Sequence, residues 1–211
     1  IVSSPQSKGR FAFSLNPLCF SKSDLGFIIN PMIILVGASA SGKTEVAKYL
    51  ASHFGIKKAI THTSREARDG EKNGVDYFFV PEPIFLQMKS RYSFVETTYY
   101  NGHYYGCSKD QVEDDRCVVV DPHGLEAFKA LQNKRVVSFL LRADAETRRA
   151  RMESRGDKPE AIASRLENDE IAFSPKNVHE ADFIIDTDDR PIEVIAKQIY
   201  ALYQKKQKKL N

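Results

Sequence analysis

The sequence has no tryptophan and only three cysteines, Cys19, Cys107 and Cys117, among 211 residues. An odd number of cysteines without a C-x-x-C spacing disfavours a disulfide framework and a zinc site, and it fits a reducing compartment such as the cytoplasm. Long apolar runs are also missing, because Asn30 and Pro31 interrupt the only stretch that approaches the ~20 residues of a membrane span. We therefore expect neither a disulfide scaffold nor a membrane protein.

Charge of one predominant sign is missing too. The 31 Lys and Arg residues against 28 Asp and Glu residues give a formal net charge of only +3. A small positive charge fits a protein that handles anionic small molecules, and it does not require a nucleic acid. The densest basic segment, QKKQKK near the end of the sequence, is typical of a solvated helix end. We expect no nucleic-acid partner, and the oligomeric state, monomer or homo-oligomer, stays open.

Residues 1–31 differ in composition from the rest of the sequence. They are rich in serine and carry three basic residues against a single acid, Asp24. This bias is typical of organelle targeting segments. A cloning or start-site extension is the alternative, because Met32 directly precedes the first strand pattern. We expect this segment to be disordered or to serve targeting, and we place the folded domain at residues 32–211.

Buried strand patterns alternate with helical patterns along the chain. Apolar runs without alternation predict buried strands at residues 32–36, 117–121, 135–141 and 182–186. Helical patterns cover residues 44–54, 125–132, 144–155, 159–173 and 192–208. This alternation indicates an α/β fold with a parallel central sheet covered on both faces. Residues 61–105 break the alternation and predict a small inserted lobe.

A glycine-rich loop follows the first predicted strand. The segment GASASGKT fits G-x-x-x-x-G-K-[ST] and leads into a helix. The glycines let backbone N–H groups turn inward around a phosphate, and the helix adds its positive N-terminal end. Lys43 would reach the β- and γ-phosphates of a nucleoside triphosphate, and Thr44 would bind the Mg²⁺ ion that bridges them. The expected binding residues are Gly37, Ala38, Ser39, Ala40, Ser41, Gly42, Lys43 and Thr44.

Two arginines three residues apart mark the inserted region. Arg65 and Arg68 lie in a polar segment that also contains two glycines. Two guanidinium forks can clamp one phosphate through charge-assisted hydrogen bonds that contribute ~1.5–3 kcal/mol each, and Tyr77 would add a hydroxyl. Taken alone, such a pair of arginines usually faces solvent.

Longer segments resemble a known family. TSREARDGEKNGVDYFF resembles the T-x-R-x-x-R-x-G-E-x-x-G-x-D-Y-x-F segment of guanylate kinases, and FVETTYYNGHYYGCSKDQV resembles their F-x-E-x-x-x-x-x-G-x-Y-Y-G-[ST] segment. VVVDPHGLEAF is similar to their D-x-Q-G block and RARMESRGD to their lid. The resemblance covers about residues 32–203. It implies the P-loop NTPase three-layer fold with a parallel central sheet, an inserted GMP-binding lobe at about 61–107 and a helical lid at about 144–170.

The resemblance also implies roles for individual residues. Glu96 would accept hydrogen bonds from N1 and N2 of guanine, whereas adenine would leave this acceptor unpaired. Asp121 would lie at the same base edge, although an acid at the end of a strand in a P-loop enzyme can also hold Mg²⁺ through water, so both roles stay open. The residues implied to hold GMP are Thr61, Arg65, Arg68, Tyr77, Glu96, Tyr105, Cys107, Asp121 and Arg165.

The lid motif can be checked against helix spacing. Arg148, Arg151 and Arg155 lie at i, i+3 and i+7, so one helix face carries all three. We expect Arg151 and Arg155, more than Arg148, to stabilise charge on the transferring phosphoryl group, as an arginine finger does. The residues expected to be catalytic are Lys43, Arg65, Arg151 and Arg155.

Four positions depart from the family pattern. Cys107 replaces a Ser or Thr that contacts guanine, and a thiol is a weak hydrogen-bond donor. His123 replaces the Gln of D-x-Q-G, and Thr97 replaces a frequent aromatic or apolar residue. Val119 stands where the family often has an acid that helps to organise Mg²⁺.

The sequence therefore predicts transfer of the γ-phosphoryl group of ATP, with Mg²⁺, to GMP or dGMP. The departures motivate one alternative, a kinase of the same fold with another phosphorylated acceptor. A second alternative is a non-catalytic interaction module, against which the intact Lys43 and Thr44 argue. The sequence does not decide between GMP and dGMP.

Overall fold

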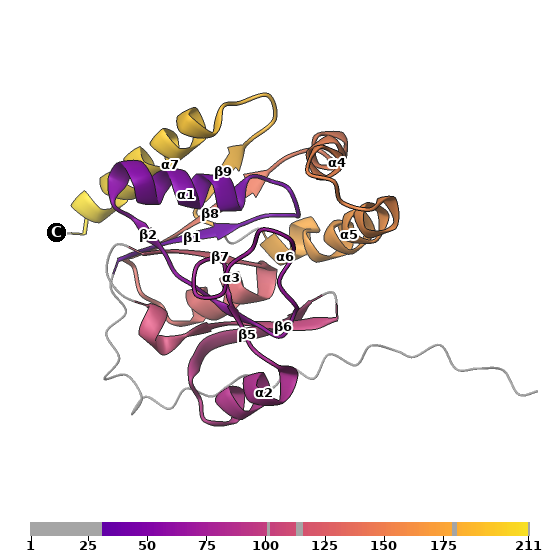
Figure 1. Cartoon of the computed structure of the whole chain (residues 1–211). Coiled ribbons are helices and arrows are strands. Elements are labelled where there is room, and N and C mark those ends of the chain that lie inside the picture. Colours follow the sequence, from indigo (N-terminus) through magenta and orange to yellow (C-terminus); the bar gives the residue numbers. More distant parts are fainter. Residues whose placement is uncertain (1–30, 101, 113–115, 179–180, 211) are drawn as a thin grey trace, which may run out of the picture.

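The computed structural model describes residues 31–100, 102–112, 116–178 and 181–210. The predicted N-terminal extension lies outside the described residues, apart from Pro31. Two β-sheets organise the described chain, and helices pack around the larger one (Figure 1).

The larger sheet has five parallel strands. In spatial order they are β2 (Lys57–Lys58), β7 (Arg116–Val120), β1 (Met32–Val36), β8 (Val136–Arg142) and β9 (Phe183–Asp186). This confirms the predicted parallel sheet and the burial of β1, β7 and β8. The predicted burial of the fourth strand was wrong, because β9 lies at the edge of the sheet and Ile184 is 53% exposed. Strand β2 was not predicted, because two residues are too few to show a periodic pattern.

Strand β1 is buried on both faces and divides the core in two. Ile33 and Leu35 pack into one apolar cluster with helices α1 (Lys43–Phe54) and α7 (Ile192–Lys208). Ile34 packs into a second cluster with α3 (Pro122–Ala130). Figure 1 shows α1 and α7 above the sheet and α3 below it. The fold is the predicted three-layer α/β arrangement.

The smaller sheet lies in the chain between β2 and β7. Its strands, in spatial order, are β4 (Phe78–Phe79), β3 (His62–Thr63), β6 (His103–Ser108) and β5 (Phe94–Tyr100). Helix α2 (Glu82–Ser90) packs on it through Phe85, whose ring stacks on Phe94 at a centroid distance of 4.7 Å. This sheet with α2 is the predicted inserted lobe.

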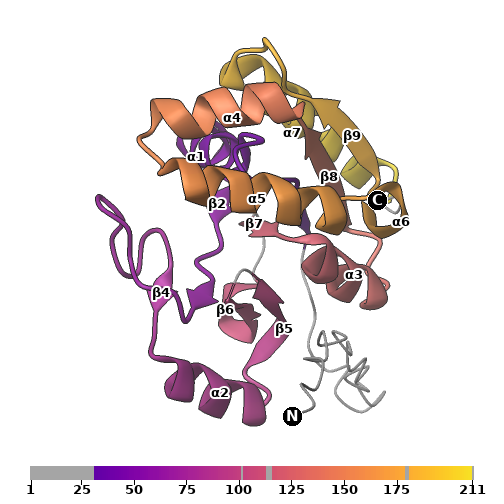
Figure 2. The same ribbon diagram turned by 90° about the vertical axis from the view of Figure 1, so that its right-hand side faces the viewer.

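Two further helices cross above the lobe (Figure 2). They are α4 (Ala145–Ser154) and α5 (Pro159–Ala172), followed by the short α6 (Pro175–Val178). Asp144 caps α4, as predicted, because its side chain accepts a hydrogen bond from the backbone nitrogen of Thr147 at 2.6 Å. A single 3₁₀ turn, η2 (Lys109–Gln111), follows β6.

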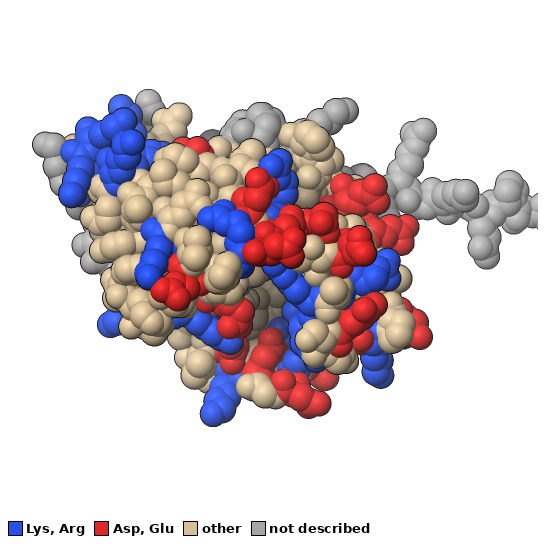
Figure 3. Space-filling model, turned by 90° about the horizontal axis from the view of Figure 1, so that it is seen from above, with Lys and Arg blue, Asp and Glu red and all other residues tan. Residues whose placement is uncertain are grey.

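Seen from above, acidic and basic side chains interleave over the surface, and basic side chains gather at the side where α7 ends (Figure 3). Lys205, Lys206 and Lys208 lie in the last turn of α7, and Lys205 and Lys208 are exposed. This agrees with the predicted solvated helix end. Among the residues described, no helix is both long and apolar enough to cross a membrane.

Candidate functional site

The loop from residue 37 to residue 44 connects β1 to α1 and closes tightly. Gly42 has a φ of +95°, in the left-handed region that glycine adopts without strain. A Cβ atom on Gly37 would lie 2.4 Å from the carbonyl oxygen of Leu141 and 2.7 Å from Oγ of Ser41. The geometry therefore requires both glycines of the motif.

Lys43 begins α1, and its ammonium group turns back to the loop. Its Nζ donates to the carbonyl oxygens of Gly37 at 2.6 Å and Ala38 at 2.7 Å. Burial lowers the pKa of Lys43 to about 8, against the opposing attraction of Asp169. A phosphate oxygen carries a full charge and is a stronger acceptor than a carbonyl oxygen, so it would draw Nζ away from the loop.

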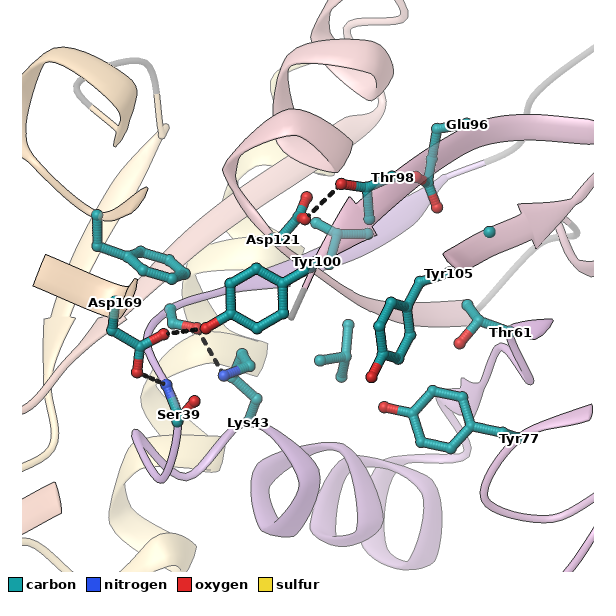
Figure 4. Close-up of a pocket in the computed structure, with 15 residues that line it drawn as sticks. Ser39, Lys43, Thr61, Tyr77, Glu96, Thr98, Tyr100, Tyr105, Asp121 and Asp169 are labelled. Carbon is teal, nitrogen blue, oxygen red and sulfur yellow. Dashed lines mark hydrogen bonds between the residues drawn. The ribbon is translucent and has the colours of Figure 1, made fainter. Parts of the chain in front are cut away.

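One cavity of about 160 Å³ joins this loop to the inserted lobe (Figure 4). Of the predicted triphosphate-binding residues, it is lined by Gly37, Ser39 and Lys43. Of the predicted GMP-binding residues, it is lined by Thr61, Tyr77, Glu96, Tyr105 and Asp121. Residues assigned to two different substrates thus face one cavity.

Glu96 lies on β5 in a buried position of the cavity wall. Its Oε1 accepts a hydrogen bond from the backbone nitrogen of Cys107 at 2.9 Å. Burial, followed by the nearby Asp121 carboxylate, raises the pKa of Glu96 to about 8. The hydrogen bond from Cys107 favours ionisation but does not offset these two effects, and two N–H donors of a bound base would favour ionisation further.

Asp121 is fixed through both of its carboxylate oxygens. Oδ1 accepts from the backbone nitrogen of Gly124 at 2.8 Å and so caps α3, which begins earlier than predicted for this reason. Oδ2 accepts from the hydroxyl of Thr98 at 2.8 Å. These two bonds aim the carboxylate of Asp121 at the side of the cavity that Glu96 lines.

Cys107 lies directly opposite Glu96 in the β5–β6 ladder. Its side chain is completely buried in the apolar cluster beneath the lobe, and its Sγ lies 3.8 Å from the carbonyl oxygen of Ser108. Gly106 forms the cavity wall beside it. In this structure Cys107 serves the site through its backbone N–H, and a contact between its thiol and guanine stays a prediction.

Arg65 is not among the residues that line the cavity, but it lies beside Tyr77, which does. Its guanidinium pairs with Glu71 at 2.9 Å, and the same side chain lies over the rings of Tyr77 and Phe79, 5.5 and 5.6 Å from their centroids. Its Nε is buried and has no hydrogen-bond partner. A guanidinium held in a fixed orientation is suited to bind an anion through its planar fork.

Arg68 lies near two other guanidinium groups. Partial desolvation, followed by the charges of Arg65 and Arg165, lowers the pKa of Arg68. Like charges gathered this closely are unfavourable until an anion joins them. The predicted pair of arginines from the lobe is therefore complemented by Arg165 from α5.

The lid arginines all have partners within the chain. Arg155 pairs with Asp157 at 2.5 Å, and Arg165 donates to the same carboxylate. Arg151 donates to the carbonyl oxygen of Ala40 in the phosphate loop at 3.1 Å. Arg148, for which we expected a smaller role, is the most buried of the three, since its side chain is 9% exposed.

The sequence did not single out Asp169 and Tyr100, although both line the cavity. Asp169 accepts from the backbone nitrogen of Ser39 at 2.8 Å and from the hydroxyl of Tyr100 at 2.7 Å (Figure 4). It also pairs with Arg148 at 2.9 Å. Asp169 stands among the exposed acids Glu167 and Glu170, so the sequence held no signal that separates it from them.

The side chains near the phosphate loop determine how a Mg²⁺ ion could be held. In the described ranges, no three or more His, Cys, Asp or Glu side chains are placed to hold a metal ion. Thr44 lies in the exposed first turn of α1. Mg²⁺ usually keeps several waters and binds one or two protein groups together with substrate phosphates. One accessible hydroxyl therefore fits an ion that arrives with the triphosphate, and Val119 adds only an apolar side chain to the cavity.

Comparison with known proteins agrees with this geometry. A family model described as guanylate kinase matches residues 30–205. A guanylate kinase of Nitrosococcus oceani is 32% identical over 180 residues, which cover 82% of this chain and 87% of that protein. A guanylate kinase of Thermus thermophilus is 31% identical over 164 residues, 74% of each chain. The crystal structure of guanylate kinase from Anaplasma phagocytophilum superimposes with a TM-score of 0.66 at 24% identity, covering 85% of this chain and 87% of that one. The chain belongs to the guanylate kinase family.

Proposed function

We propose that the chain transfers the γ-phosphoryl group of ATP to GMP or dGMP, giving ADP and GDP or dGDP. The acceptor phosphate is a nucleophile at neutral pH, so no covalent intermediate with the protein is needed. Catalysis then consists of positioning two anionic substrates and neutralising the charge between them.

The lobe would bind the acceptor. Glu96 accepts from N1 and N2 of guanine, with Asp121 at the same edge. Arg65 and Arg68, with Arg165 from the lid, bind the acceptor phosphate, and the hydroxyls of the cavity-lining Thr61, Tyr77 and Tyr105 complete its shell. The buried position of Glu96 makes this a selective site, because a base without the two donors leaves the carboxylate unpaired.

The loop and the lid would bind the donor. Backbone N–H groups of residues 37–44 and the ammonium of Lys43 hold the β- and γ-phosphates. The hydroxyl of Thr44 would hold the Mg²⁺ ion that accompanies ATP, and this ion would supply charge neutralisation at the phosphates. Arg155 leaves its ion pair with Asp157 and binds the transferring phosphoryl group instead. Arg151 donates to the phosphate loop and so holds the lid over that loop.

One observation supports the proposal most strongly: the loop lysine Lys43 and the buried carboxyl of Glu96 line the same cavity. We further propose that the protein works in the cytoplasm, where the buried, unpaired thiols of Cys107 and Cys117 stay reduced.

Initial rates of ADP release with GMP, dGMP, AMP and UMP test the function. We expect turnover of GMP and dGMP, and discrimination against AMP and UMP of about 10⁴-fold. Glu96→Gln should raise KM for GMP about 100-fold or more, because the NH₂ group of glutamine cannot accept a hydrogen bond from N1 or N2 of guanine. Glu126→Gln, at an exposed position on α3, is the matched control.

Two results of this assay would contradict the proposal. Absence of GMP turnover with turnover of another phosphorylated acceptor would assign a different substrate to the same cavity. Absence of all turnover together with no ATP binding by calorimetry would indicate a non-catalytic interaction module.

A further inference from the structure

The carboxylate of Asp169 joins three segments that are far apart in the sequence. Asp169 lies on α5 and is 1% exposed. Its Oδ2 accepts from the backbone nitrogen of Ser39 at 2.8 Å and from Nη1 of Arg148 at 2.9 Å. Its Oδ1 accepts from the hydroxyl of Tyr100 at 2.7 Å. The phosphate loop, the lid helices and the inserted lobe therefore meet at one side chain (Figure 4).

The burial of this carboxylate depends on its partners. Removing a carboxylate from water is unfavourable unless a counter-charge and hydrogen-bond donors replace its hydration. Arg148 supplies the charge, while Ser39 and Tyr100 supply further donors. Hydrogen bonds to a charged group are about twice as strong as those between neutral groups. The position of the lid is thus energetically linked to the positions of the loop and the lobe.

Tyr100 is the partner that comes from the acceptor side. It ends β5, the strand that also presents Glu96 and Thr98 to the cavity. Burial, followed by the neighbouring Asp169, raises the pKa of Tyr100, so its hydroxyl stays protonated and can donate. A displacement of β5 relative to α5 makes or breaks this bond.

We propose that Tyr100 and Asp169 are positioning residues that couple the two substrate sites. GMP held against β5 fixes the lobe where Tyr100 reaches Asp169, and Asp169 then holds α5 against the Ser39 amide of the phosphate loop. Each nucleotide therefore favours binding of the other. By linkage, GMP raises the affinity for ATP by the same factor, here called the coupling factor, by which ATP raises the affinity for GMP. This inference rests on the proposed function.

Calorimetry on the full chain measures the coupling directly. The probe is the non-hydrolysable β,γ-imido analogue of ATP with Mg²⁺, titrated with and without saturating GMP, and GMP is titrated with and without the analogue. For the unmodified chain we expect each nucleotide to raise the affinity of the other about tenfold. Tyr100→Phe, which removes only the hydroxyl, should reduce this factor to about twofold or less.

Tyr99→Phe is the matched control, because Tyr99 precedes Tyr100 on the same strand and is 61% exposed. It should keep the full coupling factor. Asp169→Asn keeps an acceptor but loses the charge, and we expect it to reduce the coupling as well. If Tyr100 only stabilised the structure, Tyr100→Phe would weaken the binding of each nucleotide and leave the coupling factor unchanged. The coupling factor therefore distinguishes a coupling role from a structural role.

The outcomes are distinct. An unchanged coupling factor in Tyr100→Phe, or independent binding of the two nucleotides to the unmodified chain, would overturn the inference and leave the proposed function intact. Failure of the unmodified chain to bind GMP would overturn the proposed function itself. Loss of coupling in Tyr100→Phe with both nucleotides still bound would support the inference.

Discussion

The ammonium nitrogen of Lys43 lies 2.6 Å from the carbonyl oxygen of Gly37, at the other end of the same loop. The lysine therefore links the two ends of the phosphate loop. Its pKa of about 8 follows from the burial of this group. Below that pH the folded chain bears the cost of a buried positive charge, and a phosphate would remove the cost.

Lys43→Met is expected to lower kcat at least about 100-fold, because one preorganised donor to the transferring phosphoryl group is lost. The melting temperature at pH 7 should change little, because removing a charge that burial disfavours offsets the loss of the two hydrogen bonds from Nζ. Initial rates and thermal unfolding check both parts. Lys48→Met on the exposed face of α1 is the control and should change neither. A clear fall in melting temperature with kcat retained would contradict the prediction.

Binding of GMP should release a proton between pH 7 and 8. The carboxyl of free Glu96 is mostly protonated there because its pKa is about 8, whereas the two donors of guanine require the carboxylate. Affinity should therefore rise with pH, up to about tenfold per unit, and level off above pH 8. The phosphate of GMP does not interfere, because its second pKa is near ~6.

Calorimetry in two buffers of different ionisation enthalpy measures this proton directly. The Glu96→Gln variant should release none in the same pH range. Equal heats in both buffers for the unmodified chain would show that Glu96 is already ionised before GMP binds.

Thr98→Val should raise KM for GMP about tenfold and leave KM for ATP unchanged. The substitution keeps the shape of the side chain but removes the donor that fixes Oδ2 of Asp121 at 2.8 Å. A hydrogen bond to a charged group contributes ~1.5–3 kcal/mol, so its loss accounts for a change of this size. Thr97→Val, one position earlier on β5, is the control. An equal rise in KM for ATP would point to a general distortion of the cavity instead.

Arg65→Lys should raise KM for GMP about tenfold or more, although it keeps the charge. Lysine lacks the planar fork that pairs with phosphate and the flat face that lies over Tyr77 and Phe79. Steady-state kinetics with varied GMP check this, with Arg91→Lys, at an exposed position of the same lobe, as the control. An unchanged KM would show that Arg65 contributes charge alone.

The sequence predicted the features that local patterns determine. Strand β1, the loop after it and helix α1 are contiguous, so an apolar run followed by G-x-x-x-x-G-K-[ST] was enough to predict them. The capping role of Asp144 was predicted for the same reason, since donor and acceptor are three residues apart. In the smaller sheet, the aromatic residues at 76–80 and 94–105 favour strands, whereas β3 was not predicted because two residues show no periodic pattern.

What could not be predicted depends on contacts between distant segments. The bond from Ser39 to Asp169 joins residues 130 positions apart, and the bond from Tyr100 to Asp169 joins residues 69 positions apart. Likewise, the pairing of Cys107 with Glu96 depends on the register between β5 and β6, and β5 is also irregular between Phe94 and Glu96. No spacing within either strand encodes that register.

The inserted lobe leaves the larger sheet after β2 and returns through β7, and these two strands are hydrogen-bonded neighbours. Both junctions of the lobe therefore lie side by side at one edge of the molecule. A segment attached in this way can be exchanged as a single cassette between kinases, because the ends of a replacement meet a fixed pair of anchor points. A replacement between β2 and β7 would change Arg65 and Glu96 and leave the phosphate loop, residues 37–44, unaltered.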